Sequence, residues 1–304
     1  MSRIDRALRI KEGAADVAVT TATDIPAGNS SPLQQYPHEE RDREPRQEAP
    51  SESIPESEPS AAGGRRRARR PQQRALVAEL PARLVTGTSS AVSIEQYRRL
   101  AAVLHEEQVQ SRLKTVMITS ALPGDGKTLT VANLALTLSE SYGRRVLVID
   151  ADLRLPALHT TLGIANHRGL SEALLDDQEL AFVEVSNGLT VLTAGAPGPS
   201  PLAGLTSDRM REILHECEER FDWVLIDTPP VGVLPDAQVL GRLVGAVVLV
   251  IGAGSTPAET VERAIAELGG PDSIFGIVLN RVEEWRIPQA NYYGQYGAPG
   301  GDKQ

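Results

Sequence analysis

Six short apolar runs within residues 115–280 constrain the fold more than any other feature of this chain. Most are continuous runs of Val, Ile and Leu, which is typical of strands that helices cover on both faces. They lie at 115–120, 145–150, 189–194, 223–227, 246–251 and 274–280. Strands that alternate with helices in this way form a parallel sheet. We therefore predict an α/β fold with a doubly wound, mostly parallel sheet.

Helical patterns occupy the spaces between most of these runs. Apolar residues recur at three- and four-residue intervals, and they predict helices at 128–142, 206–219, 236–243 and 257–268. A further amphipathic helix is predicted at 93–108, ahead of the first strand. Packing against the sheet would by itself explain the apolar face of that helix.

The N-terminal part of the chain has a different composition. Residues 1–75 are rich in Pro, Ser, Glu, Arg and Gln and carry few large apolar side chains. Such a segment buries too little apolar surface to offset the entropy of ordering it. We predict disorder over 11–75, with a possible short helix at 2–10. A folded α/β domain at 76–285 and a flexible tyrosine-containing tail at 286–304 complete the predicted organisation.

Charge and cysteine content limit the partners and the compartment. The net charge of −9 argues against a nucleic-acid binder, so no specific nucleic acid is expected. The basic run at 65–70 is either a solvated linker or a contact for an anionic leaflet, nucleic acid or an acidic partner. The single cysteine, Cys217, fits a reducing compartment. Because no apolar stretch reaches the ~18–20 residues of a membrane span, we expect a cytoplasmic protein.

The run A-L-P-G-D-G-K-T at 121–128 lies between a predicted strand and a predicted helix, as a phosphate-binding loop does. Its glycines allow the backbone to approach an anion, which amides and the helix N-terminus would hold. Lys127 would reach the terminal phosphates, and Thr128 would bind Mg²⁺. Ala121 replaces the usual first glycine. The expected nucleotide contacts are Pro123, Gly124, Asp125, Gly126, Lys127, Thr128 and Leu129.

Carboxylates follow two of the predicted strands. Asp150 and Asp152 are two residues apart on an extended segment, so their side chains project to the same side. An aspartate at this position often caps the next helix, but a pair followed by Arg154 indicates a metal-and-base site. Asp227 ends another strand, where a carboxylate reaches the shell of Mg²⁺ through water. The three motifs together predict a site for ATP and Mg²⁺.

These residues resemble the bacterial tyrosine kinases, P-loop kinases of polysaccharide synthesis that are unrelated in fold to the eukaryotic protein kinases. The resemblance runs from about Ser93 to Val282 and implies a sheet of the P-loop NTPase type. S-A-L-P-G-D-G-K-T, V-L-V-I-D-A-D-L-R-L-P-A-L-H and L-I-D-T-P-P-V look like the A, A′ and B motifs of the family. E-Q-Y-R-R-L, R-G-L-S-E-A-L-L and G-I-V-L-N-R-V also fit.

The resemblance implies roles for the matching residues. Thr128, Asp152 and Asp227 would hold Mg²⁺. Lys127 would bind phosphate and act in catalysis with the two A′ aspartates. Asp150 is the candidate for accepting the proton of the tyrosine hydroxyl, although Asp150 and Asp152 could exchange their roles. Phosphoryl transfer depends mainly on positioning and charge neutralisation, so this small set suffices.

The C-terminal end carries the expected acceptors. Asn280 would lie near the adenine, and Tyr292, Tyr293 and Tyr296 form a cluster in a glycine-rich tail. Family members usually carry such a cluster, which neighbouring subunits phosphorylate in trans. The resemblance therefore implies self-association and a membrane-embedded polysaccharide co-polymerase or activator that recruits the chain to the inner face of the membrane. A sticky tail without an acceptor role is the alternative.

Two departures and two rival functions remain. The family often has E-x-x-R-x-x-R in its oligomerising helix, but here Glu95 and Arg98 are followed by Ala101, so the sequence leaves ring assembly undecided. The tyrosine cluster of the tail is short, so the number of phosphorylation steps is also undecided. A partitioning-type ATPase would carry a lysine where this loop has Leu122. A non-kinase, ATP-sensing subunit of a polysaccharide export complex would use the same pocket. We predict a tyrosine autokinase that transfers the γ-phosphate of ATP to its own tail.

Overall fold

The fold is that of a computed structural model, which describes residues 73–74, 84, 91–175, 179–198 and 200–282. The predicted helix at 2–10, most of the predicted disorder at 11–75 and the tail at 286–304 lie outside these residues. One correction concerns Gln73 and Arg74, which form a short strand where we predicted disorder. Backbone pairing with a neighbouring strand accounts for this strand, because pairing at a sheet edge requires no apolar side chain.

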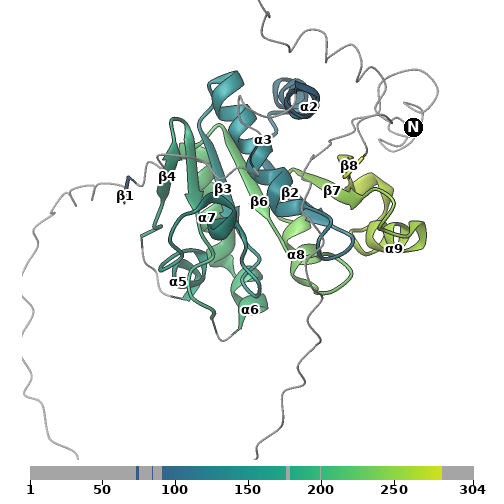
Figure 1. The fold of residues 1–304 in the computed structure, drawn as a ribbon. Helices are drawn as coiled ribbons and strands as arrows, with labels where there is room; N and C mark the ends of the chain where they lie inside the picture. The colour runs from purple at the N-terminus through teal and green to yellow at the C-terminus, as the bar shows by residue number, and fades with distance from the viewer. Residues whose placement is uncertain (1–72, 75–83, 85–90, 176–178, 199, 283–304) are drawn as a thin grey trace, which may run out of the picture. The chain divides into compact units, whose positions relative to one another are not determined.

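The described strands form one eight-stranded sheet in the order β1-β4-β5-β3-β6-β2-β7-β8 (Figure 1). Every pairing is parallel except that of β4 with β5. The strands are β1 (Gln73–Arg74), β2 (Thr115–Ser120), β3 (Val146–Asp150), β4 (Val183–Ser186), β5 (Leu189–Leu192), β6 (Trp223–Asp227), β7 (Ala246–Gly252) and β8 (Gly276–Asn280). All six predicted strands are present, which confirms the mostly parallel α/β fold.

Helices cover both faces of the sheet. They are α2 (Ala91–Ser111), α3 (Lys127–Tyr142), α4 (Leu158–Leu162), α5 (Leu170–Leu175), α6 (Pro201–Leu205), α7 (Asp208–Arg220), α8 (Asp236–Gly241) and α9 (Ala258–Glu267), with a 3₁₀ turn at Pro271–Ser273. Alternate residues of each strand face opposite ways. Val116 and Ile118 of β2 belong to the core under α2 and α3, whereas Met117 belongs to the core under α5, α7 and α8. The sheet is therefore doubly wound.

The predicted helix at 93–108 is longer than expected and packs differently. It runs from Ala91 to Ser111, and Figure 1 shows it lying beside α3. The buried Tyr97 hydroxyl contacts Asn133 of α3 at 3.3 Å. Desolvation by burial, the largest influence, raises the pKa of Tyr97 to about 12. This helix thus packs on the helix that begins at the phosphate loop, as well as contributing to the core over the sheet.

Besides β1, sequence reasoning missed the strand β4 and several short helices. The strand β4 turns back antiparallel onto β5 through Asn187 and Gly188, and Gly188 has a φ of 84°. Asn-Gly is a strong hairpin signal, so the sequence contained this information. The helix α6 occupies part of the loop predicted after 189–194, where Pro201 provides a favourable first residue.

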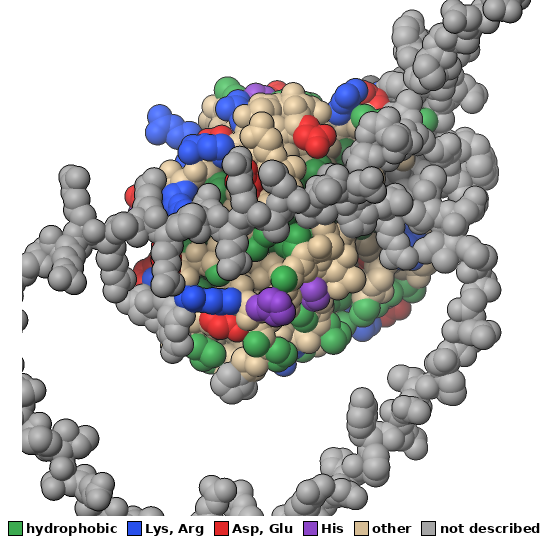
Figure 2. Space-filling model, turned by 60° about the vertical axis from the view of Figure 1, so that its left-hand side comes forward, with side chains coloured by type: hydrophobic (Ala, Val, Ile, Leu, Met, Phe, Trp, Pro, Cys, Tyr) green, Lys and Arg blue, Asp and Glu red, His purple; other side chains and the backbone are tan. Residues whose placement is uncertain are grey.

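The described surface mixes charges of both signs. On the face seen in Figure 2, basic and acidic side chains are interspersed. Several pair along α7, including Arg211 with Asp208 at 2.7 Å and Arg220 with Glu216 at 3.0 Å. Such exposed pairs contribute little to stability. Within the described part of the chain, no helix combines the length and apolar character that a membrane span requires.

Leu225→Ala should lower the free energy of unfolding by about 2–5 kcal/mol, because Leu225 is fully buried in the central strand β6 and its truncation leaves a cavity. Urea unfolding followed by circular dichroism measures this loss. The matched control is Leu155→Ala, since Leu155 is 80% exposed and its replacement should change stability by no more than about 0.5 kcal/mol. Equal losses in the two variants would contradict the assigned core.

Candidate nucleotide-binding site

The loop between β2 and α3 has the backbone of a phosphate cradle. Gly124 and Gly126 have φ angles of 85° and 99°, in the left-handed region that favours glycine. Gly126 is the N-cap of α3 and makes no side-chain capping bond, so the first amides of this 16-residue helix are left to bind an anion. A methyl group on Gly126 would meet the Asn280 amide at 2.0 Å. The predicted glycines are therefore required by the conformation.

A bond within the loop and contacts from two other segments hold this loop in place. The Asp125 carboxylate accepts bonds from the Leu122 amide at 2.9 Å and from the Thr256 hydroxyl at 2.6 Å. At the end of β8, the Asn280 side chain donates to the Asp125 carbonyl at 2.8 Å, and the Arg281 guanidinium donates to the Gly124 carbonyl. Sequence reasoning assigned no role to Thr256, which belongs to no motif, or to Arg281, which lies in the G-I-V-L-N-R-V segment.

The register of two neighbouring strands brings the predicted carboxylates together. Asp150 of β3 and Asp227 of β6 are paired in register at the carboxyl ends of their strands. Strands in a sheet are about 4.8 Å apart, so the two carboxyl groups begin side by side. Asp152 follows in the loop after β3, and all three aspartates are at most 5% exposed. The phosphate loop follows β2, the next strand along the same edge.

The Asp150 carboxyl group is enclosed by backbone amides. Its two oxygens accept bonds from Asp152 at 3.2 Å and from Leu158 at 3.1 Å. Burial is the main reason that the pKa of Asp150 is raised, to about 8, and the charge of Asp227 raises it further. A carboxyl group with such a pKa can hold or release a proton near neutral pH.

The Lys127 ammonium lies between the other two aspartates. It is 3.2 Å from Asp152 and 3.8 Å from Asp227. Burial lowers the pKa of Lys127, but the charges of Asp227 and Asp152 outweigh this and raise it overall, so the side chain stays charged. Desolvation raises the pKa of Asp227 to about 6 despite the nearby ammonium. The Lys127 ammonium is thus a positive charge within a cluster of three buried aspartates.

Asp227 supports the fit to a metal ion. It is fully buried, and neither of its oxygens has a hydrogen-bond partner within 3.5 Å among the described residues; the Lys127 ammonium is 3.8 Å away, and the Thr128 hydroxyl is a further polar neighbour. Such a group is costly to keep ionised unless a cation lies nearby. The described residues contain no group of three or more His, Cys, Asp or Glu side chains arranged to hold a metal alone. A hydroxyl, water and phosphate oxygens would have to complete the shell, as is usual for Mg²⁺ beside phosphates.

The remaining predicted residues occupy different positions. Pro123 is exposed at the tip of the loop, whereas the side chain of Leu129 packs against the core, so any nucleotide contact of Leu129 would come from its backbone. Asn280 braces the loop, and its place beside the adenine stays a prediction. The tyrosines at 292, 293 and 296 lie outside the described residues.

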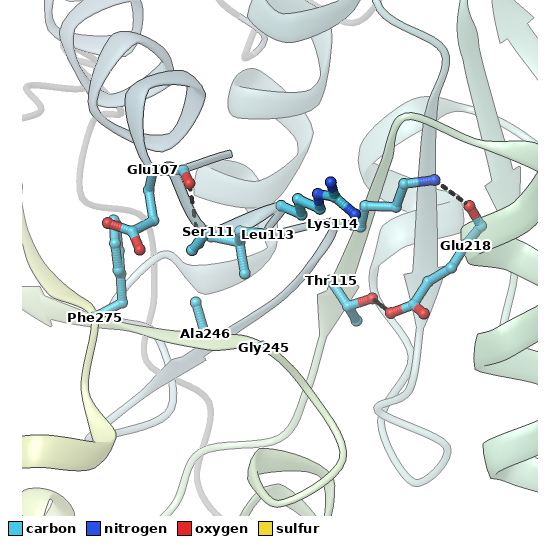
Figure 3. A pocket seen from close by; sticks show the side chains of 10 residues that line it. Glu107, Ser111, Leu113, Lys114, Thr115, Glu218, Gly245, Ala246 and Phe275 are labelled. Atoms are coloured by element: carbon cyan, nitrogen blue, oxygen red, sulfur yellow. Dashed lines mark hydrogen bonds between the residues drawn. The ribbon is translucent and has the colours of Figure 1, made fainter. Parts of the chain in front are cut away.

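A separate cavity of about 310 Å³ lies at the amino end of β2, at the opposite edge of the sheet from the phosphate loop. In Figure 3 the side chains of Lys114 and Thr115 point toward Glu218. The ammonium donates to the Glu218 carbonyl at 2.6 Å, and the hydroxyl donates to its carboxylate. These groups join β2 to α7, which is a structural role.

The fold and the site define a P-loop nucleotide-binding protein, and comparison with known families agrees. Residues 116–294, more than half of the chain, match the family described as CbiA, the CobQ/CobB/MinD/ParA nucleotide binding domain. Within it, the tyrosine-protein kinase YwqD of Bacillus subtilis (strain 168) is 38% identical over 208 residues, which are 67% of this chain and 87% of YwqD. This chain belongs to the bacterial tyrosine-protein kinase family of CobQ/CobB/MinD/ParA-type domains.

Other relatives differ in how much of their length is shared. The putative tyrosine-protein kinase CapB of Staphylococcus aureus is 31% identical over 67% of this chain and 90% of CapB. The tyrosine-protein kinase Etk of Escherichia coli (strain K12) is 35% identical over 69% of this chain, but this match spans only 29% of Etk.

Solved structures show the same architecture. The kinase domain of Escherichia coli Etk is similar with a TM-score of 0.60 and 35% identity, covering 63% of this chain and 76% of that domain. The chimerical protein CapA2B2 is similar with a TM-score of 0.60 and 29% identity, covering 64% of this chain and 86% of the chimera. The P-loop type of sheet that we predicted is thereby confirmed.

Removing the Asp227 charge should change how stability depends on pH. The folded-state pKa of Asp227 is raised from 3.8 to about 6, so ionising this group destabilises the ligand-free fold as the pH rises through that window. The free energy of unfolding of Asp227→Asn minus that of the parent chain should therefore be higher by roughly 1–2 kcal/mol at about pH 8 than at about pH 4.5, so the variant gains relative stability as the pH rises. Urea titrations at both pH values measure it. A pH-independent difference would contradict the raised pKa.

Proposed function

We propose that this protein is an ATP- and Mg²⁺-dependent tyrosine autokinase, a protein-tyrosine phosphotransferase that acts on its own C-terminal tail and regulates exopolysaccharide synthesis or export. The observation that carries the proposal is a charged cluster beside the phosphate loop. In it, Lys127 lies close to Asp152 and Asp227, and Asp150 is paired in register with Asp227. Membership of the tyrosine-protein kinase family supports it.

Each residue has a proposed part in the reaction. The loop amides and Lys127 bind the phosphates and neutralise charge that develops on them. Thr128, Asp152 and Asp227 hold Mg²⁺, which neutralises phosphate charge when bound. Asp150 accepts the proton of the tyrosine hydroxyl, for which a pKa of about 8 is suited near neutral pH. Asn280 keeps the loop in its binding conformation through the Asp125 carbonyl.

The acceptors and partners extend the same proposal. Tyr292, Tyr293 and Tyr296 receive the phosphate, and a second copy of the chain presents them. The chain works on the cytoplasmic face of the membrane with a membrane-embedded activator that belongs to the polysaccharide machinery. Similarity to the chimerical protein CapA2B2 and to CapB supports a role beside a partner.

A nucleotide switch is the competing function. A non-kinase ATPase or ATP-sensing subunit would use the same loop and the same carboxylates. Leu122 stands where the partitioning-type ATPases have a second lysine, and its side chain is partly buried. The presence of three clustered tail tyrosines favours the kinase, because a switch has no need of an acceptor.

Incubation of the full chain with ATP and Mg²⁺ should produce phosphotyrosine on the tail, which peptide mass spectrometry localises. Lys127→Ala should reduce this labelling by about 10²- to 10³-fold, because it removes the one cation among the buried acids. Replacing Tyr292, Tyr293 and Tyr296 by Phe should remove most labelling and leave ATP affinity unchanged. Intact ATP binding without any phosphotyrosine, with and without a membrane fraction, would favour the switch.

The two A′ aspartates should give different kinetic signatures. Asp150→Asn should lower the rate of labelling by about 10²- to 10⁴-fold at saturating Mg²⁺ and remove the acidic limb of the pH profile. Asp152→Asn should instead raise the Mg²⁺ concentration needed for half-maximal labelling. Rates measured against pH and against Mg²⁺ separate the two roles, and the reverse pattern would assign the base to Asp152.

A further inference from the structure

Two of the most exposed apolar side chains flank the acidic site. Leu155 is 80% exposed and Val233 is 55% exposed, whereas the strands beneath them are fully buried. Leu155 lies in the loop that carries Asp152, and Val233 lies in the turn after β6. Each alone would be unremarkable on a protein surface. Their common position beside the reacting groups distinguishes them from the other exposed apolar residues.

The backbone fixes Leu155 next to the site. Its amide donates to the Asp152 carboxylate at 3.1 Å, and the other oxygen of that carboxylate contacts Lys127 at 3.2 Å. Leu155 is therefore one hydrogen bond away from a group that we assign to metal binding. Its side chain, in contrast, is exposed.

The turn that carries Val233 packs on the start of the phosphate loop. The Val231 amide donates to the Ser120 carbonyl at 2.9 Å, and Gly232 lies against the carbonyl of Ala121. The strand β6, which precedes Val233, is the neighbour of β2 on one side. The strand β8, which ends in Asn280, lies beyond β7 on the other side. Val233 and Asn280 thus flank the phosphate loop from opposite sides.

An ion pair joins the two segments. Arg154, the neighbour of Leu155, binds Asp236 at 2.9 Å, and Asp236 is fully buried at the start of α8, three residues after Val233. This pair holds the loop after β3 against the segment after β6. Leu155 and Val233 are therefore parts of one surface, which we call the apolar rim.

We propose that the apolar rim, Leu155 and Val233, is the docking surface for the tyrosine-bearing tail, residues 287–301 of this chain. This inference rests on the proposed kinase function and adds the residues that select the acceptor. The segment 287–301 contains three tyrosines and not one charged side chain. An uncharged aromatic segment gains from apolar contact and avoids the repulsion that three buried carboxylates exert on an acidic one.

The length and origin of the tail fit this occupant. Val282 is the last residue that the structure describes. It lies two residues beyond Asn280, whose side chain contacts the phosphate loop. Tyr292 is the tenth residue after Val282, and an extended chain of ten residues spans at most about 33–36 Å. A segment of that length can enter the site of a second copy of the chain, and contact with Leu155 there would place an acceptor hydroxyl beside Asp150 and Asp152.

The test uses the full chain with Tyr292, Tyr293 and Tyr296 replaced by Phe, so that it accepts no phosphate on its own tail. A synthetic peptide of residues 286–301 serves as the acceptor, and the initial rate of phosphotyrosine formation is measured against peptide concentration. Leu155→Asn should raise the KM for the peptide about fivefold and Val233→Ser about threefold, with kcat within about twofold of the parent.

Val109→Ser is the matched control. Val109 is 72% exposed on α2 near the amino edge of the sheet, away from the phosphate loop, so its replacement should leave the KM unchanged. ATP affinity, measured with a fluorescent analogue, verifies that each variant retains the nucleotide site.

The possible results separate this inference from the kinase proposal. No labelling of the peptide by the parent chain, either alone or with a membrane fraction added, would overturn both. Labelling by the parent with an unchanged KM in both rim variants would overturn the docking surface and leave the kinase standing. A fall in kcat alone would also overturn it, since that result would mean that Leu155 acts only by positioning Asp152.

Discussion

The register of β3 against β6 is the constraint on which the site depends. It places Asp150 opposite Asp227 at the ends of two fully buried strands, where the helices on both faces exclude water. Each carboxyl group is then costly to ionise, and together they raise one another's pKa. Lys127 offsets part of this cost but leaves more negative than positive charge in the cluster. The ligand-free fold therefore keeps an electrostatic strain that a bound cation relieves.

The phosphate loop is held by contacts from distant parts of the chain. Asp125 receives Thr256 from the loop after β7, and its carbonyl receives Asn280 from the end of β8. The order of strands explains this arrangement, because β7 and β8 are the neighbours of β2 on one side of the sheet. The last described residues of the chain are thus tied to the phosphate loop at the carboxyl edge of the sheet.

Sequence reasoning recovered the parts of this structure that have a local signal. The continuous apolar strands and the glycines at 124 and 126 could be predicted because burial and positive φ angles restrict residue types strongly. The sequence placed Asp150 and Asp227 at the ends of two strands, but it did not predict that these strands are neighbours, which the structure shows. The ion pair of Arg154 with Asp236 was missed, since it joins residues 82 apart with no periodic pattern to connect them. That Arg154 and Asp236 are neighbours can be recognised only once the order of the strands is known.

The same edge of the sheet presents two kinds of chemistry that favour different ligands. Asp152 faces Lys127 and the nucleotide site, while its neighbour Leu155 points to solvent three residues later. Charge attracts a metal and phosphates over several ångströms, but it gives little discrimination among tyrosine-containing segments. Apolar contact acts only at short range and in proportion to the area that is covered. A short loop that carries both therefore separates the recognition of nucleotide from that of acceptor, and the Asp152–Leu155 hydrogen bond keeps the two in a fixed relation.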